Sequence, residues 1–358
     1  MKEKLKKNLT IFEALKLPMI SIALGLLIGG LVIALSGYNP AAAIIGMFKG
    51  GFQPGYYLAT TLGRATPIIF AGLAGAIAWG SGYPSLGAAG QMTLGALVAA
   101  IVAVNVKGPA VVVMLVSLAA GAVTGMAISW VSAFICDKFE MWLLIITLMM
   151  NYVCDYIASY VTTYVCKDPF GSDSSAIQTQ KIEVGILPKI ISKYSLHYGF
   201  VLAVVSVLLV LFIMKKTSFG YKAKMGGLNP HFAEYGGIKS KKMMYRVLLL
   251  SGLFAGLGGA CEVLGTNYRY VDAMISSPAY AWKGVITTLM ANNNPIGVFL
   301  SSIFLAGIKT GGSSLERSMG LSSEITSIIE GTITLLVTAK LTFSLKKRSV
   351  RAGKETKR

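Results

Sequence analysis

Apolar residues along this chain gather into long runs that short polar segments separate. A helix that crosses a bilayer needs about 20 mainly apolar residues, because it rises about 1.5 Å per residue through a hydrocarbon core about 30 Å thick. The runs therefore predict an all-α, polytopic membrane protein with about ten transmembrane helices. We expect these helices near residues 17–36, 60–80, 87–106, 109–134, 141–164, 198–214, 247–266, 279–292, 295–311 and 323–343.

The eighth and ninth of these expected spans are short, and the sequence Asn292-Asn293-Asn294-Pro295 interrupts them. Two interpretations stay open. The pair forms two full crossings, or it forms a broken pair of helices that does not fully cross the membrane.

A polar, basic segment fills residues 217–238, between two apolar runs, and reads TSFGYKAKMGGLNPHFAEYGGI. Asn229-Pro230 predicts the start of a short helix, because Pro is favoured in a first helical turn. Gly236-Gly237 predicts its end, because Gly readily adopts the left-handed conformation just past a helix. A short surface helix held between two membrane spans has a shape suited to docking a partner.

Composition agrees with the pattern of apolar runs. Hydrophobic residues make up 54% of the 358 residues, charged residues make up 13%, and the mean hydropathy is +0.66. A soluble domain carries about 25% charged residues. The chain is therefore expected to be an integral membrane protein that passes through the cell membrane (plasma or inner membrane) several times.

The formal net charge of +18 is distributed unevenly. Lys and Arg concentrate near the N-terminus, in residues 215–246 and in the C-terminal tail, always close to the ends of expected spans. Cytoplasmic segments of membrane proteins carry such an excess of cations. The charge is thus typical of membrane orientation and contact with the lipid bilayer, and we expect no nucleic acid partner.

An even number of spans places both termini on the same side, and the basic clusters favour the cytoplasm for both. We expect residues 1–16 to be a basic cytoplasmic N-terminus, 17–343 a transmembrane domain and 344–358 a basic cytoplasmic tail. Within that domain we expect a cytoplasmic loop at 215–246 and an external loop at 165–197.

Catalytic and metal-binding patterns are missing from the sequence. There is no GxxxxGK[ST] phosphate-binding loop, and the two histidines, His197 and His231, fall in expected loops. The four cysteines show no metal-ligand spacing. We therefore expect a non-catalytic chain without a metal or cofactor of its own. If it pumps a solute, a partner or an ion gradient supplies the energy.

Polar residues within the expected spans are the candidates for a solute path. Thr147, Asn151, Asp155 and Ser159 recur every four residues and so share one face of the fifth span. Such a stripe either lines a water-filled path or holds helices together. Gln91 lies among three glycines just after the break at residues 80–84, where a restarting helix aims amide donors inward.

Glu262 is a further candidate, since it lies late in the seventh expected span. An ionisable side chain there costs roughly 2.5–3.5 kcal/mol on insertion scales, so its presence suggests a function. The alternatives are a structural ion pair with Arg64 or Arg269, or solvation at the membrane surface.

Three segments together resemble one family. They are TLMMNYV (147–153), the segment 217–238 quoted above, and SGLFAGLGGACEVLG (251–265). In order and spacing they resemble the permease subunits of ABC importers for nucleosides and simple sugars, especially those that work with basic-membrane-protein-type lipoproteins. The resemblance extends from about Pro67 to Lys340, and the nucleoside branch is closer than the ribose branch.

In that family the cytoplasmic loop carries a coupling helix that inserts into a cleft of the ATPase. The matching positions here are Asn229, Pro230, Ala233, Glu234, Tyr235, Gly237 and Ile238, with Glu234 where a second Ala is common. One departure concerns the family's N-I-G-x-E-G-Q sequence. Here Ser85 and Ala89 replace its Asn and Glu, while Gln91 and both glycines remain.

The resemblance implies a permease subunit of an ATP-driven importer that takes up nucleosides by alternating access. Its implied partners are ABC ATPase subunits, which hold ATP and Mg, a second homologous permease chain, an extracytoplasmic substrate-binding lipoprotein and a small-molecule solute. The expected path residues are Gln91, Thr147, Asn151, Asp155 and Glu262. The alternatives are an ABC permease for a simple sugar such as ribose, or a gradient-driven secondary transporter.

Overall fold

The computed structural model describes residues 24–25, 27–35, 37–168, 177–320, 324–325, 327–329 and 331–332. Within these ranges the ordered structure is helical, and the β-type pairing is confined to three isolated bridges, such as the one between Lys189 and His197. The expected basic termini at 1–16 and 344–358 lie outside the described residues. So do residues 17–23 of the first expected span and most of the tenth.

Seven helices of the described part are long and apolar enough to cross a membrane. Each matches one of the expected spans within a few residues, apart from extra turns at some ends. They are α3 (Tyr56–Gly80), α4 (Ala88–Asn105), α5 (Ala110–Phe139), α6 (Leu143–Tyr160) with the π-helical turn η1 (Val161–Val165), α7 (Gly199–Lys216), α10 (Ser240–Glu262) with the π-helical turn η2 (Val263–Asn267), and α12 (Pro295–Met319).

The expected eighth span, 279–292, forms a shorter helix than a crossing needs. Helix α11 (Tyr280–Met290) has 11 residues, which corresponds to about 16 Å and falls well short of a hydrocarbon core of about 30 Å. Asn292 and Asn293 follow it with positive φ angles of 49° and 61°. The left-handed turn at these asparagines ends α11, so the eighth expected span is too short to cross, whereas the ninth, α12 with 25 residues, is long enough. Neither interpretation of the pair therefore holds for both of its members.

Three further helices connect or precede the spans. Helix α2 (Pro40–Phe52), which the sequence reasoning did not predict, begins where the Asn39 side chain accepts hydrogen bonds from the backbone N–H groups of Ala41 and Ala42. Helices α8 (Ser218–Leu228) and α9 (Pro230–Tyr235) lie between α7 and α10. The short helix expected after Asn229 is thereby confirmed.

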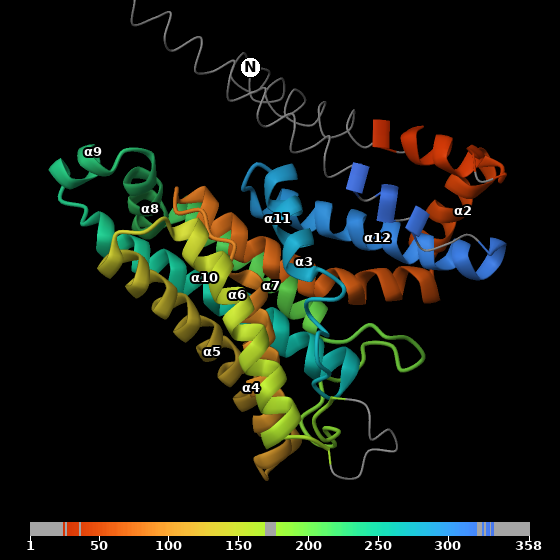
Figure 1. Cartoon of the computed structure of the whole chain (residues 1–358), viewed down its shortest axis with the longest axis horizontal. Coiled ribbons are helices and arrows are strands. Elements are labelled where there is room, and N and C mark those ends of the chain that lie inside the picture. The colour runs from red at the N-terminus through yellow and green to blue at the C-terminus, as the bar shows by residue number, and fades with distance from the viewer. Residues whose placement is uncertain are drawn as a thin grey trace, which may run out of the picture. The chain divides into compact units, whose positions relative to one another are not determined.

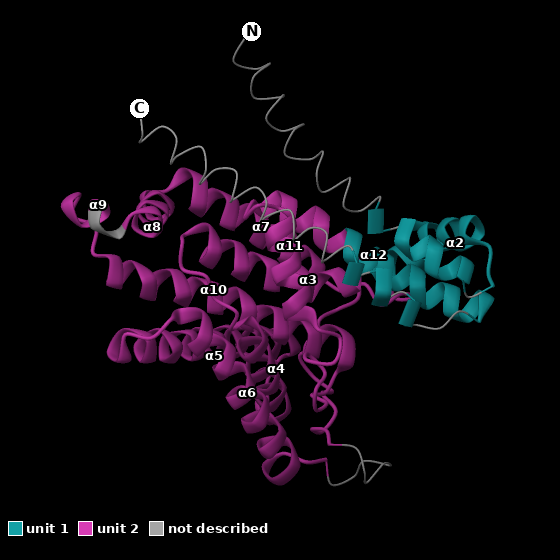
Figure 2. Cartoon of the chain, turned by 45° about the horizontal axis from the view of Figure 1, so that its top comes forward, with its two compact units in different colours: residues 1–61, 304–358 teal, residues 62–303 magenta. Residues whose placement is uncertain are grey.

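The chain divides into two compact units, which Figure 2 colours separately. The smaller unit comprises residues 1–61 and 304–358, and in its described part α2 packs on the second half of α12. The contact is between backbones, because a Cβ at Gly51 would overlap the carbonyl oxygen of Gly307. The hydroxyl of Thr61 donates a hydrogen bond of 2.7 Å to the Gly51 carbonyl and ties the start of α3 to α2.

The larger unit, residues 62–303, is built around α4, α5 and α10, which pack closely side by side (Figure 1). Five glycines, Gly95, Gly121, Gly125, Gly252 and Gly256, form the glycine seam where these helices meet. A Cβ at Gly125 would overlap the Gly252 carbonyl oxygen, and one at Gly95 would lie 2.9 Å from the Gly256 Cα. Small residues four apart allow this approach, as their spacing on α5 and α10 predicts.

The helices give the larger unit two distinct ends. Because α7 is an 18-residue helix, it separates the segment before it from the segment after it by about 27 Å. We call the end with α8, α9 and the start of α10 the α9 end (residues 217–240). We call the end with η1, η2 and the segment leading into α7 the His197 end (residues 161–168, 177–198 and 263–279).

Candidate functional site

Helix α9 is a short helix that its own sequence closes at both ends. At its start the Asn229 side chain accepts a hydrogen bond of 3.1 Å from the N–H of Phe232, and Pro230 is the first helical residue. At its end Gly237 has a φ of +76°, and Ile238 N–H donates to the Ala233 carbonyl while Gly237 N–H donates to the Glu234 carbonyl. This pattern is a Schellman motif, so most free backbone groups of the helix have partners.

The side chains of α9 and its flanks face two ways. The Ala233 side chain is buried. The Tyr235, Leu228 and Phe232 side chains are 94%, 70% and 68% exposed, respectively. Glu234 is exposed and lines a pocket of about 480 Å³ together with Gly237, Ile238 and residues 239–242. The helix therefore presents large apolar side chains and a pocket rim to its surroundings, on a backbone that is already folded.

Two of the expected path residues on α6 hold the loop before α4. The Thr147 hydroxyl accepts a hydrogen bond of 3.0 Å from the Leu86 N–H, and the Asn151 amide donates one of 2.9 Å to the Leu86 carbonyl. Asn151 also accepts from the N–H of Gly90 in the first turn of α4 at 2.9 Å. Both residues thus join α6 to the start of α4.

Gln91 lies on the first turns of α4 and is 2% exposed. Its side-chain oxygen Oε1 is buried and makes no hydrogen bond within the described part of the protein. Burying an acceptor without a partner costs roughly 1–3 kcal/mol. Gln91 therefore carries an acceptor that the described residues leave unpaired.

The other half of the α6 stripe reaches the segment before α11. Ser276 donates a hydrogen bond of 3.1 Å to Asp155 Oδ2, and Ser159 donates one of 3.4 Å to Asp272. The second oxygen of Asp155, Oδ1, is buried and unpaired among the described residues. The stripe therefore joins α6 to the start of α4 and to the segment before α11, and Asp155 adds a second acceptor without a partner among the described residues.

Glu262 is 3% exposed and lies at the last turn of α10. Its carboxylate accepts hydrogen bonds from the Tyr280 hydroxyl at 3.2 Å, from the Thr266 hydroxyl at 3.3 Å and from the Asn267 amide at 3.4 Å. The positive charge of Arg64 on α3 also acts on it. Three donors and a nearby cation offset much of the cost of burying this carboxylate.

His197 continues this network, which sequence reasoning missed because the residue lies in an expected loop. Its side chain is fully buried, Nδ1 accepts a hydrogen bond of 3.2 Å from the Gly199 N–H, and Nε2 lies 3.4 Å from the Thr266 hydroxyl. Burial lowers the pKa of His197 to about 4, so the ring is neutral at physiological pH. Thr266 therefore links a neutral histidine to the Glu262 carboxylate.

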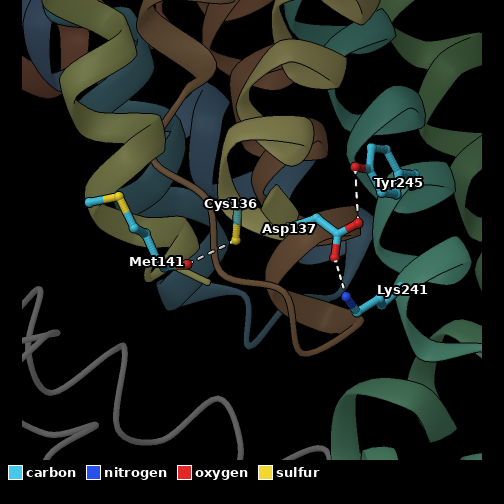
Figure 3. A network of polar contacts seen from close by, with 5 residues as sticks. All are labelled: Cys136, Asp137, Met141, Lys241 and Tyr245. Carbon is cyan, nitrogen blue, oxygen red and sulfur yellow. Dashed lines mark hydrogen bonds and ion pairs between the residues drawn. The ribbon is translucent and has the colours of Figure 1, made fainter. Parts of the chain in front are cut away.

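A second network lies at the α9 end, between the last turn of α5 and the first turn of α10 (Figure 3). Asp137 forms an ion pair of 2.7 Å with Lys241 and accepts a hydrogen bond of 3.3 Å from Tyr245. Next to it, the Cys136 thiol donates to the Met141 carbonyl at 3.0 Å. Because these helices are about a hundred residues apart in sequence, no local pattern indicates the contact.

Among the described residues no cluster of three or more His, Cys, Asp or Glu side chains has the geometry of a metal site. The hydrogen-bonding side chains described above lie on α4, α6 and α10, and two of them, Gln91 on α4 and Asp155 on α6, carry a buried acceptor without a partner among the described residues.

Comparison with known proteins adds an independent observation. The guanosine ABC transporter permease protein NupP of Bacillus subtilis is 30% identical over 90% of this chain and 92% of its own length. The glucose ABC transporter permease protein TsgB13 of Haloferax volcanii is 28% identical over 89% and 86%. The nucleoside ABC transporter permease protein NupB of Lactococcus lactis is 23% identical over 95% and 96%. No solved structure matches.

Residues 57–338 match the family described as branched-chain amino acid transport system / permease component. The match includes α3 to α12 and therefore both ends of the larger unit. Together with seven candidate membrane-spanning helices, it identifies a multi-pass protein of the cell membrane. The chain thus belongs to the family of ABC transporter permease components, and it is a permease subunit.

Proposed function

We propose that this permease subunit takes up nucleosides as part of an ATP-driven importer. The observation that carries the proposal is the 30% identity to a guanosine permease over nine-tenths of the chain. The unused acceptors of Gln91 and Asp155 support it, because the hydroxyl groups of a ribose ring are donors that such acceptors can bind. The solute path in this proposal contains Gln91, Thr147, Asn151, Asp155 and Glu262.

Helix α9 is the proposed docking site for an ABC ATPase, which in this proposal holds the ATP and Mg. The exposed Leu228, Phe232 and Tyr235 side chains support the proposal, since a rigid apolar protrusion suits insertion into a cleft. Asn229, Pro230, Ala233, Glu234, Gly237 and Ile238 shape or flank this helix. Closure of two ATPase subunits then moves α9 and switches the path between outward and inward openings.

The remaining partners and the orientation follow from the same proposal. A second permease chain completes the path, and an extracytoplasmic binding lipoprotein delivers the solute at the His197 end. The lysines on and around α8 support placing the α9 end in the cytoplasm, and the basic clusters near both termini favour the same side for them.

Uptake by the reconstituted importer tests the proposal. Labelled guanosine is offered to vesicles that hold this subunit, its partner permease, the ATPase and the binding lipoprotein, with or without MgATP on the ATPase side. We expect uptake that requires ATP and that excess unlabelled ribose or glucose does not reduce. Uptake that does not depend on ATP but requires an imposed ion gradient would contradict the ATP-driven mechanism.

A simple sugar is the second candidate solute, because TsgB13, a glucose permease, is 28% identical to this chain. The same experiment separates the two. ATP-dependent uptake of labelled glucose or ribose without uptake of guanosine would keep the mechanism and change the solute.

A further inference from the structure

The Ser81–Gly87 loop between α3 and α4 touches both flanks of α9. On one side it meets the end of α8, where a Cβ on Gly82 would lie 2.5 Å from the Gly227 Cα and a Cβ on Gly227 would overlap the Ser81 carbonyl oxygen. On the other side the Tyr83 hydroxyl donates a hydrogen bond of 3.2 Å to the Ser240 carbonyl, at the first residue of α10. The loop is thus in contact with the residues just before and just after α9.

The same loop is fixed to the helices that carry the proposed solute path. Two side chains of α6 form hydrogen bonds with the Leu86 backbone. Its N–H donates to the Thr147 hydroxyl, and its carbonyl accepts from the Asn151 amide. Ser85 accepts a hydrogen bond of 3.0 Å from the Trp79 indole through its backbone carbonyl, which holds the loop against the end of α3. One residue after the loop, α4 begins and leads to Gln91.

The contacts on the α8 side leave little room for independent movement. Gly82 has a φ of +75° and faces Gly227, so backbone meets backbone with no side chain between them. A side chain can absorb a displacement by changing its rotamer, whereas a close-packed backbone contact passes it on. A shift of α8 relative to the membrane helices must therefore move the loop as well.

We propose that the Ser81–Gly87 loop transmits the movement of α9 to α4 and α6, with Tyr83, Gly82 and Gly227 as its positioning residues. This inference rests on the proposed docking of an ATPase on α9. In it, ATPase closure pushes both flanks of α9, the loop follows, and the hydrogen bonds at Leu86 carry the displacement to the helices that hold Gln91 and Asp155.

The test measures guanosine uptake and ATP hydrolysis in the same vesicles, with the complete importer. Tyr83→Phe removes one hydroxyl and leaves the ring in place. We expect uptake per ATP hydrolysed to fall at least threefold, while hydrolysis and the thermal stability of the complex stay near the wild-type values. The matched control is Tyr156→Phe, because Tyr156 is 76% exposed on α6, outside both the α9 end and the His197 end, and its variant should keep both rates.

Gly227→Ala provides the second, stronger variant, since the added methyl group must push the loop away from α8. We expect a tenfold or greater fall in uptake per ATP. Gly108→Ala makes the same chemical change where a Cβ would lie 4.0 Å from its nearest neighbour, and it should have no effect. If Gly227→Ala prevents assembly, Tyr83→Phe still decides.

An unchanged ratio of uptake to hydrolysis in Tyr83→Phe would overturn the inference, whether both rates stay at their wild-type values or both fall by the same factor. A wild-type importer whose uptake does not depend on ATP would instead overturn the proposed function and this inference with it. The wild-type measurement therefore distinguishes failure of the inference from failure of the function on which it rests.

Discussion

Buried polar side chains in the larger unit differ in whether the protein satisfies them. The Asn151 amide donates a hydrogen bond to the Leu86 carbonyl and accepts one from the Gly90 N–H. By contrast, one side-chain oxygen of Gln91 and one of Asp155 have no partner among the described residues. A buried group that the fold satisfies contributes to stability, and one that it leaves unpaired costs free energy. At the scale of single residues, this difference predicts that Asn151 matters mainly for stability and that Gln91 and Asp155 matter mainly for the proposed solute path.

Asn151→Leu and Gln91→Leu should therefore fail in different ways. Asn151→Leu leaves the Gly90 N–H and the Leu86 carbonyl without partners, at a cost of roughly 1–3 kcal/mol for each buried group. We expect a melting temperature several degrees lower in a thermal unfolding assay. Gln91→Leu removes an unpaired acceptor, so we expect an unchanged or higher melting temperature together with at least tenfold slower uptake. The reverse pattern would contradict the assignment.

Glu262→Gln keeps the size of the side chain and removes its charge. Hydrogen bonds to a charged acceptor contribute roughly 1.5–3 kcal/mol, and Tyr280, Thr266 and Asn267 all donate to this carboxylate. We expect ATP-driven uptake to weaken severalfold but to persist, whereas a gradient-driven transporter would lose coupling completely. Glu316→Gln is the control, because Glu316 is exposed on α12 and its variant should take up solute normally.

Stability should fall in mild acid because of His197. Its pKa is about 4 in the folded protein, against about 6.5 when unfolded, so only the unfolded state binds a proton between these values. Above pH 6.5 the histidine is neutral in both states and does not lower the free energy of unfolding. As the pH falls from 6.5 toward 4, the free energy of unfolding decreases by about 1.4 kcal/mol per pH unit. We expect a lower melting temperature at pH 5.5 than at pH 7. His197→Gln should reduce this difference, and His231→Gln, at the other histidine, should not.

At the scale of single elements, α9 is notable because its shape depends on local groups more than on packing. Six residues are too few to form a stable helix alone, so the Asn229 cap and the Schellman motif at Gly237 are essential to it. An N-cap contributes about 1 kcal/mol and the left-handed glycine avoids strain. The element is therefore formed before any partner arrives, which lowers the entropy cost of docking.

Tyr235→Ala should weaken ATPase binding without disturbing the fold. The side chain is 94% exposed, so its loss removes little packing within this chain. We expect the affinity of the purified ATPase for the permease to fall at least tenfold in a pull-down titration, with an unchanged melting temperature. Tyr198→Ala, an equally large truncation at the His197 end, should bind the ATPase normally. Equal binding by both variants would contradict docking on α9.

Sequence alone predicted the elements better than their contacts. Seven spans and the start of α9 were predicted correctly, because the length of apolar runs and a proline in a first turn are local signals. Helix α2 was missed, since its 13 residues are too few to read as a span, and 279–292 was expected as a span although its helix ends at Met290. The partners of Thr147 and Asn151 lie about 60 residues earlier, and that of Asp137 about a hundred residues later, where no periodicity indicates them.

At the scale of the whole molecule, the distribution of charge is the feature that decides orientation. Lysines gather on α8 and at the start of α10, and the loop at the other end of α7 carries both signs of charge. Cationic segments remain on the cytoplasmic side when a membrane protein inserts. The whole chain should therefore lie with its α9 end in the cytoplasm, where an ATPase can reach it.

Labelling of single introduced cysteines checks this orientation. Lys193→Cys and Lys222→Cys place a thiol on an exposed position at the His197 end and on α8, respectively. In intact cells, a membrane-impermeant maleimide should label Lys193→Cys at once and Lys222→Cys only after permeabilisation. The wild-type chain, with its four native cysteines, gives the background signal. Labelling in the opposite order would reverse the proposed orientation.

The glycine seam has a consequence for how this subunit can change over evolutionary time. Every single-base change that alters a glycine codon adds at least a methyl group, and at Gly125 and Gly256 any Cβ would overlap a backbone oxygen of the neighbouring helix. No one-step mutation at these positions is small enough to be neutral. In a saturation library grown on an imported nucleoside, the seam should appear as a set of depleted positions recurring every fourth residue on α5 and α10, while exposed positions such as Val123 on α5 tolerate substitution.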